Sequence, residues 1–449
     1  MKVLLISANT TNAPHPVYPL GLDYVAGALA PRHQVRILDM NLAPGPGELE
    51  TAVRETAWGL IGISIRNIDN VDALAVKSFI PGYERIVRLV RGCSAAPVVL
   101  GGSGFSIFPG ELMARLGADF GVVGAGEAIR PLADALEAGT DPCVLPGITC
   151  RGRSPGGAAA RGGDVSRQTC PDEAQLRYYL GRGGILNLQT KRGCPFHCVY
   201  CTYPHIEGRQ FRLYPPDGVA REARRLQELG ARYLFLTDSA FNGDEDHALA
   251  VARAFRSAGV EVPWGAFFAP LRPPGGFYDR MAEAGLTHVE FGTETLCDPQ
   301  LRRYGKPFTS ADVFIAHEQA RRAGLYIAHY LLLGGPGEDP HTVAETLERT
   351  ERLEKAVFFA FCGIRIFPHA PLYPLALEEG QIAPGQDLLT PVFYRSRGIG
   401  TAEILARVKE KAAGRVNWVT GDGGDETERI VTRMHRRGRP GPLWELLLR

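Results

Sequence analysis

The sequence predicts an α/β protein in which a doubly wound parallel sheet is followed by a partial (βα)6 barrel and a small helical C-terminal tail. Two observations predict this fold class. Short apolar runs alternate with helical stretches in two separate series, and strands spaced by helices pair in parallel through right-handed crossovers. Between the series, residues 151–164 are rich in Gly, Ala, Pro and Ser, which is typical of a connection. We expect a first domain at 1–140, a linker at 141–180, a second domain at 181–395 and the tail at 396–449.

The first series contains the strands of the doubly wound sheet. We expect them at Val3–Ser7, Val35–Asp39, Leu60–Ser64, Val98–Leu100 and Gly121–Val123. In such sheets the ligand binds at the carboxyl ends of the strands, where Ser64, Gly101 and Gly102 lie. A nicotinamide cofactor is excluded, because the segment after the first strand lacks the Gly-x-Gly-x-x-Gly turn that cradles its phosphates.

The second series contains the strands of the barrel. We expect them at Ile185–Thr190, Tyr233–Thr237, Trp264–Phe268, His288–Phe291, Tyr326–Leu333 and Phe361–Ile366. Amphipathic helices, such as Asp246–Ala258 and Ser310–Ala323, separate these strands. Ligands of such a barrel bind at the carboxyl ends of its strands. The tail is charged, and its basic run at Arg433–Arg439 is typical of a solvated helix surface.

Bulk properties exclude several classes of partner. Lys and Arg number 50 against 49 Asp and Glu, so no net field would attract nucleic acid. No run reaches the roughly 18 apolar residues of a membrane span. Met1–Ser7 has the pattern of a strand and not of a signal peptide, which predicts a cytoplasmic protein. Nine cysteines in such a chain predict reduced thiols with metal or catalytic roles, and not a disulfide framework.

Three of these cysteines stand together directly after the first barrel strand. The segment KRGCPFHCVYC places Cys194, Cys198 and Cys201 in a Cys-x-x-x-Cys-x-x-Cys spacing. Thiolates are the standard ligands of iron–sulfur clusters, and three of them on one loop hold a [4Fe-4S] cubane with one iron left open. The alternative is a structural zinc site that adds His197 or His205. Zinc sites more commonly use paired Cys-x-x-Cys units, so the spacing favours the cluster.

On these residues the sequence resembles the radical S-adenosylmethionine superfamily. The resemblance implies that the cysteines bind the catalytic cluster, that the open iron binds S-adenosylmethionine, and that Tyr200 lies near the adenine. Further segments match the family at strand ends, and they contribute Asp238 and Asn242 from FLTDSAFN, Glu294 from FGTET, Gly334 and Gly335 from LLLGGPGED, and the segment GIRIFPHAPLY. One departure is clear. The family's Gly-Gly-Glu, which holds the methionine amine, is replaced by Thr237, Asp238 and Ser239.

The first domain is similar to the Rossmann-like cobalamin-binding domain that many radical enzymes carry. The similarity lies in PLGLDYVAGAL, GISIRN, VVLGGSGFSIFP and GVVGAGEA. It implies that Ser64, Gly101 and Gly102 admit the dimethylbenzimidazole tail of cobalamin, because glycine leaves room for a flat aromatic group. The Asp-x-His-x-x-Gly loop of cobalamin mutases is absent. We therefore expect no protein histidine below the cobalt.

Together, the two resemblances imply a cobalamin-dependent C-methyltransferase. It would act on an unactivated carbon of a small-molecule or lipid-like substrate, through methylcobalamin and a 5'-deoxyadenosyl radical, with an electron donor such as flavodoxin or ferredoxin. The alternative on the same scaffold is a non-methylating radical enzyme, such as an oxidative cyclase. A corrinoid-binding sensor or carrier is a more remote alternative, because the cysteine triad and the barrel imply turnover.

Overall fold

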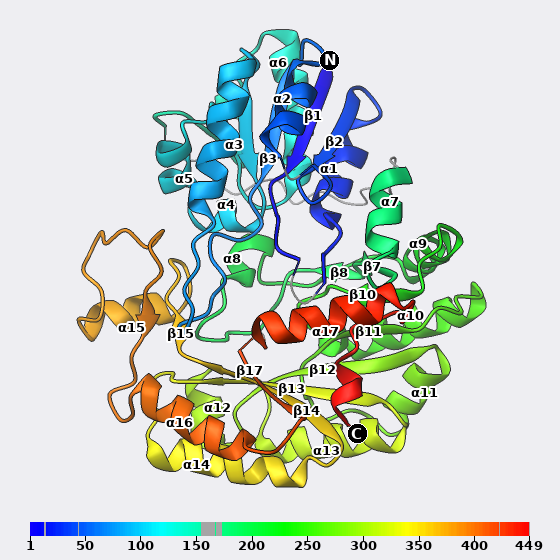
Figure 1. Ribbon diagram of the computed structural model, residues 1–449, viewed down its shortest axis with the longest axis vertical. Helices are drawn as coiled ribbons and strands as arrows, with labels where there is room; N and C mark the ends of the chain where they lie inside the picture. The colour runs from blue at the N-terminus through cyan, green and yellow to red at the C-terminus, as the bar shows by residue number, and fades with distance from the viewer. Residues whose placement is uncertain (13–14, 44, 154–166, 168–172, 422, 449) are drawn as a thin grey trace.

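The computed structural model of the protein describes residues 1–12, 15–43, 45–153, 167, 173–421 and 423–448. It contains two large sheets, each flanked by helices, and the first sheet lies above the second in Figure 1. Each sheet collects the strands of one of the two predicted series. The predicted α/β class, with a doubly wound unit followed by a partial barrel, is therefore confirmed.

The first sheet has six strands in the order β2-β1-β3-β4-β5-β6. These strands are β1 (Lys2–Ser7), β2 (Gln34–Asp39), β3 (Leu60–Ser64), β4 (Val98–Gly101), β5 (Phe120–Val122) and β6 (Ile148–Cys150). The first five are parallel, whereas β6 pairs antiparallel with β5. Strand β6 falls in the range that the sequence predicts as linker. The order 2-1-3-4-5 is that of flavodoxin-like sheets, which bind ligands at the switch point between β1 and β3.

Helices cover both faces of this sheet, which explains why its strands are continuous apolar runs. These helices are α1 (Leu20–Leu29), α2 (Pro46–Arg54), α3 (Ile80–Cys93), α4 (Ser103–Ile107), α5 (Pro109–Leu116) and α6 (Ile129–Ala138). Most of the segment 151–164, predicted as a connection, lies outside the described residues. Helix α7 (Glu173–Leu180) leads into the second sheet.

The second sheet has seven parallel strands in the order β17-β14-β13-β12-β11-β10-β7. These strands are β7 (Ile185–Leu188), β10 (Tyr233–Leu236), β11 (Trp264–Phe268), β12 (Leu286–Glu294), β13 (Tyr326–Leu333), β14 (Ala356–Cys362) and β17 (Trp418–Thr420). The predicted sixth strand, Phe361–Ile366, is placed too late: β14 ends at Cys362, and Ile364–Arg365 form β15, which pairs antiparallel with β16 (Phe393–Tyr394).

The C-terminal tail is not purely helical, in contrast to the prediction. Its strand β17 pairs with β14 and extends the barrel to a seventh strand. Three residues are too short a run to show a strand period, so the barrel edge of β14 selects this strand through tertiary pairing. The tail also contains α16 (Thr401–Ala412), α17 (Gly424–Arg436) and the short 3-10 helix η5 (Trp444–Leu448).

The helices around the barrel begin and end at recognisable signals. They are α9 (Pro216–Glu228), α10 (Glu245–Ser257), α11 (Phe277–Glu283), α12 (Asp298–Arg303), α13 (Ser310–Arg322) and α14 (Pro340–Arg349). Helix α15 (Leu372–Glu378) instead packs into the core of the first sheet. Helix α13, for example, starts at a capping box in which Thr309 and Asp312 satisfy each other's backbone N–H groups. No helix in the described part of the chain is both long and apolar enough to cross a bilayer.

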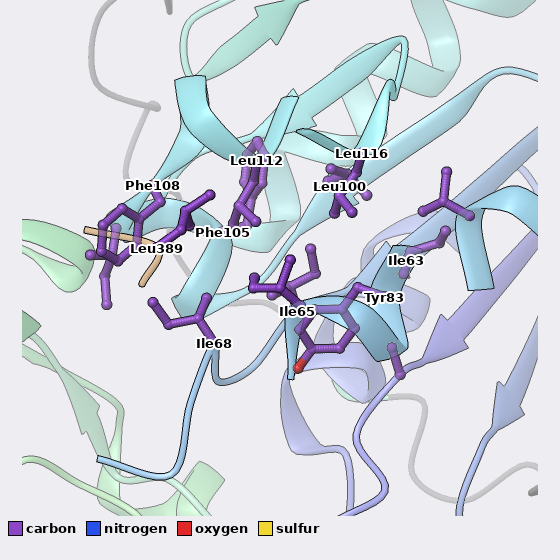
Figure 2. Packing of buried hydrophobic residues seen from close by; sticks show 14 of the residues in the cluster. Ile63, Ile65, Ile68, Tyr83, Leu100, Phe105, Phe108, Leu112, Leu116 and Leu389 are labelled. Atoms are coloured by element: carbon purple, nitrogen blue, oxygen red, sulfur yellow. The ribbon is translucent and has the colours of Figure 1, made fainter. Parts of the chain in front are cut away.

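One hydrophobic core joins the two halves of the molecule. It combines side chains of the first sheet and its helices with residues of the segment from Ile364 to Tyr394. Figure 2 shows Leu389, from this segment, beside Phe108, which lies between α4 and α5. Val199, in the cysteine loop, belongs to the same core. The two sheets are therefore held in one arrangement by shared apolar packing.

Cys143 and Cys150 form a disulfide, so the expectation of reduced thiols is wrong for this pair. The turn at Pro142–Val144 and strand β6 bring their Cα atoms to 5.8 Å, a separation that the spacing alone does not reveal. The other cysteines in the described ranges, including all three of the triad, are free.

Candidate active site

The cysteine loop leaves the barrel at the end of β7 and is held close to its neighbours by backbone contacts. Strand β8 (Lys191–Arg192) pairs with β9 (Arg212–Leu213) and is followed by Gly193, whose φ is +84°. A Cβ at Gly193 would lie 2.1 Å from the carbonyl oxygen of Gln210, so only glycine fits. The Cys194 N–H then donates to the Gly208 carbonyl at 3.0 Å. These contacts fix where the loop turns into its first cysteine.

The three thiols lie in one partly desolvated environment. Cys194 is buried, and Cys198 and Cys201 are half-buried. Burial, together with the other thiols, raises the pKa of Cys198, and it raises that of Cys201 to about 12. The Cys201 Sγ also accepts a hydrogen bond from the Tyr203 N–H at 3.4 Å. Free thiols in such a pocket are suited to ligate a group that replaces their protons.

The arrangement favours a cluster over a single zinc ion. In the described residues, only His33, Asp134 and Glu137 bring three potential ligand atoms within 4.8 Å of one another. The triad is therefore more widely spread than ligands of one tetrahedral zinc, whose sulfur atoms would be about 3.8 Å apart. The two histidines of the zinc alternative have other partners. His197 Nδ1 lies 3.3 Å from Arg209, and His205 stacks on His369 at 3.8 Å.

Asp238 lies beneath the cysteine loop, where its carboxylate is occupied by the chain itself. Its oxygens accept hydrogen bonds from the Thr190 N–H at 2.8 Å and from the Thr190 hydroxyl, and Oδ2 lies 3.0 Å from Lys191 Nζ. Both charged side chains are almost completely buried. Asp238 thus orients the start of the loop, and this arrangement disfavours the predicted direct contact with a cofactor.

Asn242 is also engaged within the protein. Its side-chain amide donates to the Ala269 carbonyl at 2.7 Å and accepts from the Ala269 N–H at 3.0 Å. This pair of bonds joins the ends of β10 and β11. The neighbouring Ser239, which replaces the family's glutamate, donates to the Gly193 carbonyl at 3.0 Å. Ser239 therefore supports the cysteine loop directly, whereas Asn242 fixes the segment after β11.

Glu294, Tyr200 and Lys306 form a buried polar triad beside the cysteines. Glu294 Oε1 accepts from the Tyr200 hydroxyl at 2.7 Å and from Lys306 Nζ at 2.9 Å, and Lys306 also donates to Tyr200 at 2.8 Å. Burial acts to lower the pKa of Lys306, but Glu294 and Cys198 outweigh it and raise that pKa. Glu294 has a φ of +62°, an unusual conformation for a non-glycine residue that is often found at functional sites.

Lys306 did not emerge from the sequence, because it lies in a turn after α12 with no periodic or motif signal. Its position places a cation near two of the three thiols. The charge of Lys306 acts to lower the pKa of Cys198 and of Cys201, against the larger effect of burial. The other two members of the polar triad, Tyr200 and Glu294, are predicted site residues, and the structure brings them together.

The glycine turn after β13 is organised around the carboxyl group of Glu338, which the sequence does not mark as a site residue. Glu338 is fully buried and accepts hydrogen bonds from the N–H groups of Gly334 and Gly335 and from the Tyr304 hydroxyl. Burial raises its pKa to about 7. Because Glu338 occupies the N–H groups of Gly334 and Gly335, these two residues shape the turn and do not offer donors to a ligand.

A cavity of about 320 Å³ lies at the carboxyl ends of the first sheet, at the β1/β3 switch point. Ser64, Gly101 and Gly102 all line it, as the sequence predicts for a ligand edge. Gly102 has a φ of +102°, and a Cβ there would lie 2.5 Å from the Ile65 carbonyl oxygen. At Gly101 the nearest atoms would be 3.9 Å away. No histidine is found among the described residues that line this cavity.

The same cavity is closed on its other side by the barrel. Part of the cavity wall comes from residues on either side of the three cysteines, namely Gln189, Arg192, Ile206 and Glu207. Arg192 lies 2.6 Å from Glu127 of the first unit, so an ion pair with both side chains largely buried joins the two sides. Figure 1 shows β8 and α8 (Tyr203–Glu207) between the two sheets. The cysteine loop is thus a shared wall of both predicted cofactor regions.

Comparison with protein-family models gives two matches. Residues 188–350 match the radical SAM superfamily, and residues 6–133 match the B12 binding domain. The matched ranges contain the cysteine triad and the strand ends of the first sheet, respectively. Each match therefore covers one of the two regions described above.

Among curated proteins, the chain is 27% identical to tryptophan 2-C-methyltransferase of Streptomyces laurentii, over 84% of this chain and 74% of that protein. It is 24% identical to an uncharacterized methyltransferase of Pyrococcus horikoshii, over 79% of this chain and 78% of the relative.

Two solved structures have the same fold. The radical S-adenosylmethionine methyltransferase TsrM from Kitasatospora setae, with tryptophan and a SAM analogue bound, aligns with a TM-score of 0.87 at 23% identity, over 100% of this chain and 98% of that one. The cobalamin-dependent S-adenosylmethionine radical enzyme OxsB aligns with a TM-score of 0.76 at 16% identity, over 92% of this chain and 67% of that one.

Proposed function

We infer that this protein, which belongs to the radical S-adenosylmethionine enzymes that carry a B12-binding domain, transfers a methyl group to a carbon atom of a small-molecule substrate. The cofactors of the reaction would be a [4Fe-4S] cluster, S-adenosylmethionine and cobalamin. The unactivated character of the carbon and a 5'-deoxyadenosyl radical as the hydrogen acceptor are part of the proposal.

One observation carries this proposal: the cavity at the β1/β3 switch point and the cysteine triad share a wall. Gln189 and Glu207 face that cavity from the chain segments on either side of Cys194, Cys198 and Cys201. A corrinoid in the cavity and a cluster on the triad would therefore lie on two sides of one short loop. This shared wall is expected of a protein that uses the corrinoid and the cluster in one reaction.

The chain's own residues have separate tasks in this scheme. When bound, cobalamin would supply the methyl carrier, and the cluster would supply the electron that cleaves S-adenosylmethionine. Cys194, Cys198 and Cys201 would hold the cluster. Lys306 would compensate the negative charge of the thiolates, while Glu294 and Tyr200 orient its ammonium group. The largely buried surroundings would limit solvent access, which suppresses side reactions of a reactive intermediate.

The test is anaerobic turnover of the reconstituted protein with cobalamin, S-adenosylmethionine and a strong reductant. Cell extracts supply candidate substrates, and mass analysis detects a gain of one methylene unit. We expect a methylated product together with S-adenosylhomocysteine and 5'-deoxyadenosine. A methylated product without 5'-deoxyadenosine would support methyl transfer and contradict the radical route. Substrate-dependent 5'-deoxyadenosine with an unchanged carbon count would contradict methyl transfer.

The Cys201→Ala variant provides a matched comparison. It should lose 5'-deoxyadenosine formation, because the cluster is missing one ligand, while cobalamin bound at the first sheet is unaffected. If cobalamin is retained and neither S-adenosylmethionine product ever forms in the unmodified protein, the protein is a corrinoid carrier and the enzyme proposal is wrong.

A further inference from the structure

A second cavity, of about 300 Å³, lies inside the barrel at the carboxyl ends of its strands. This size is at the lower end of the range of small-molecule sites, about 300–1,000 Å³. The residues that line it are Ser239, Phe267, Phe268, Gly292, Glu294, Tyr330, Leu332 and Phe361. We call it the lumen cavity. It shares Glu294 with the polar triad beside the cysteines.

The walls of the lumen cavity are mainly aromatic. The rings of Tyr330 and Phe361 are nearly parallel, with an interplanar angle of 12° and centroids 6.3 Å apart. Phe267 meets Tyr330 edge-on at 6.1 Å. Although Phe267 lies on a central barrel strand, it is 40% exposed. A large apolar side chain left open inside a barrel loses contact with water only when a ligand covers it.

The lower end of the lumen is closed by the C-terminal segment. Trp444, in η5, is buried with Ala328, Val357 and Val419, which come from three strands of the barrel. Its Nε1–H donates to Glu290 Oε1 at 3.0 Å. A ligand in this cavity therefore lies between the floor that this segment forms and the strand ends that carry the cysteine loop, and its depth is limited.

Glu290 also fixes the orientation of Tyr330. The Tyr330 hydroxyl donates to Glu290 Oε2 at 2.9 Å, and the Tyr330 ring stacks on Phe359 at 4.9 Å. The phenol oxygen is thus directed towards the floor, and the ring stays in the wall of the cavity. Burial raises the pKa of Glu290, whose two hydrogen-bond donors are both neutral side chains.

Gly292 leaves the middle of the cavity open. Along β12, Glu290 and Gly292 lie on the same face by strand alternation, with Glu290 at the floor. Glu294 follows a shift in the pairing register and lines the cavity at its mouth. A Cβ at Gly292 would meet only Glu294 Oε1, at 3.4 Å, and its backbone has no positive φ. The backbone therefore tolerates a side chain at Gly292, and the cavity exists because none is present.

We propose that the lumen cavity binds a planar aromatic ring of the methyl-accepting substrate, and that Tyr330 determines this specificity. Two approximately parallel rings and one edge-on ring match the offset-stacked and edge-to-face contacts that aromatic groups prefer. Because Glu294 lies at the mouth of the cavity, a ring bound there lies beside Tyr200, Lys306 and the cysteine loop. This proposal rests on the proposed function, because it assigns a substrate class to the same site.

The probe pair is 2-naphthol and its saturated counterpart decahydro-2-naphthol, which are neutral and differ in aromaticity and planarity. Equilibrium dialysis is carried out anaerobically on the full chain with cluster and cobalamin reconstituted. We expect about tenfold tighter binding of 2-naphthol, because stacking adds to simple apolar burial. Tyr330→Leu should remove most of this preference, whereas Tyr330→Phe, which keeps the ring, should retain it. Equal affinity of the unmodified protein for both probes would overturn the proposal.

Substitutions that fill the lumen cavity test the proposal independently. Gly292→Val should abolish binding of both probes, and Gly92→Val, the same change in α3 where a Cβ has open space around it, should leave binding intact. Cobalamin content and cluster absorption show that each variant is folded and reconstituted. If Gly292→Val is folded and still binds 2-naphthol with unchanged affinity, the probe binds elsewhere and the lumen assignment is wrong.

The adenine of S-adenosylmethionine is also a planar ring, so a competition arm separates the two occupants. With saturating S-adenosylhomocysteine, we expect 2-naphthol to remain bound, because the substrate and the nucleoside occupy different places. Displacement of 2-naphthol would assign the cavity to the nucleoside and overturn the proposal. A failure of the proposed function would look different. If 2-naphthol binds as expected but no extract yields a methylated product, the aromatic site stands and the methyltransferase assignment is wrong.

Discussion

The Nε atom of Arg365, in β15, lies 3.0 Å from Oδ2 of Asp69, in the loop after β3, and both side chains are only 1% exposed. This ion pair joins the first unit to the segment that follows β14, 296 positions away. The guanidinium of Arg365 also donates to the carbonyls of Ile366 and Leu388. Burial lowers the pKa of Arg365, and Asp69 acts against that shift.

We predict that Asp69→Asn strongly destabilises the protein. The substitution leaves the buried Arg365 cation without a counter-charge, a change that typically costs about 3–5 kcal/mol in the free energy of unfolding. Denaturant unfolding followed by circular dichroism measures the effect. Glu283→Gln is the control, because its partner Arg256 lies at 2.7 Å but both side chains are 58% exposed, and the loss there should stay below about 1 kcal/mol. Similar losses in both variants would contradict the prediction.

The second prediction concerns metal content. After anaerobic reconstitution the protein should hold about four iron and four sulfide, and Ala at Cys194, Cys198 or Cys201 should remove them. Elemental analysis and visible absorption measure the content. Cys297→Ala is the control, because Cys297 is a buried free thiol at the N-cap of α12 and is not one of the three predicted ligands. Stoichiometric zinc without iron absorption in the native protein would contradict the cluster.

Lys306 provides the third prediction. A buried cation beside thiolates stabilises the reduced, more negative state of a cluster. Lys306→Gln should therefore make the midpoint potential more negative, by on the order of 50–100 mV, while iron content remains unchanged. A redox titration followed by paramagnetic resonance measures the potential. Lys306→Arg keeps the charge and should shift the potential much less; equal shifts in the two variants would show that packing, and not charge, is responsible.

How far the sequence predicted the site differs between residues. The cysteine triad and the strand ends were predictable because their signals are local: thiols at a fixed spacing and apolar runs that end in Ser or Gly. Lys306 and Glu338 were not, because each gains its role only when distant elements pack against it. The motif around Asp238 predicts a contact with the cofactor, whereas Thr190 and Lys191, at another strand end, bind its carboxylate.

The strands show the same division. The apolar run of β13 is visible in the sequence and is predicted with its observed bounds, Tyr326–Leu333. Strand β12, which alternates apolar and polar residues, is longer at both ends than the predicted His288–Phe291. Strands β6 and β17 have only three residues each and depend on an existing edge for their pairing. The lumen cavity also could not be predicted, because its walls come from five strand ends whose inward faces are set by the curvature of the partial barrel.

The fourth prediction is a pH dependence caused by Glu338. Burial raises its pKa from 4.5 to about 7 in the folded protein. Between these values the folded protein keeps a proton that the unfolded chain has lost. The stabilisation is therefore present at acidic pH and is lost as the pH rises through 7, by up to about 3 kcal/mol.

Glu338→Gln isolates this contribution, because it cannot titrate. Unfolding free energies at about pH 5 and about pH 8 should differ more in the unmodified protein than in the variant, with the unmodified protein losing stability at the higher pH. Asp312→Asn serves as the comparison, since the pKa of that half-buried capping carboxyl is lowered. The carboxyl is ionised in both states above about pH 5, so its variant should keep the same stability difference between about pH 5 and about pH 8 as the unmodified protein. Identical pH profiles for Glu338→Gln and the unmodified protein would contradict the prediction.

The fifth prediction separates two adjacent glycines at the cavity of the first sheet. At Gly101 a side chain has room within the protein, since its Cβ would be 3.9 Å from the nearest atoms of Val122. Gly101→Leu should therefore fold normally but fill the cavity and weaken cobalamin binding at least about tenfold. At Gly102 the positive φ and the clash with Ile65 act on the backbone itself. Gly102→Ala should lower the melting temperature even without cobalamin.

Spectrophotometric titration with hydroxocobalamin and thermal unfolding of the cobalamin-free protein measure the two effects side by side. Gly110→Leu, in α5 with open space around its Cβ, controls for the added leucine. The contrast is decisive because the two positions are neighbours in sequence but differ in what surrounds them. If Gly101→Leu binds cobalamin with unchanged affinity, the corrinoid does not enter between β3 and β4, and the cavity at the β1/β3 switch point has another occupant.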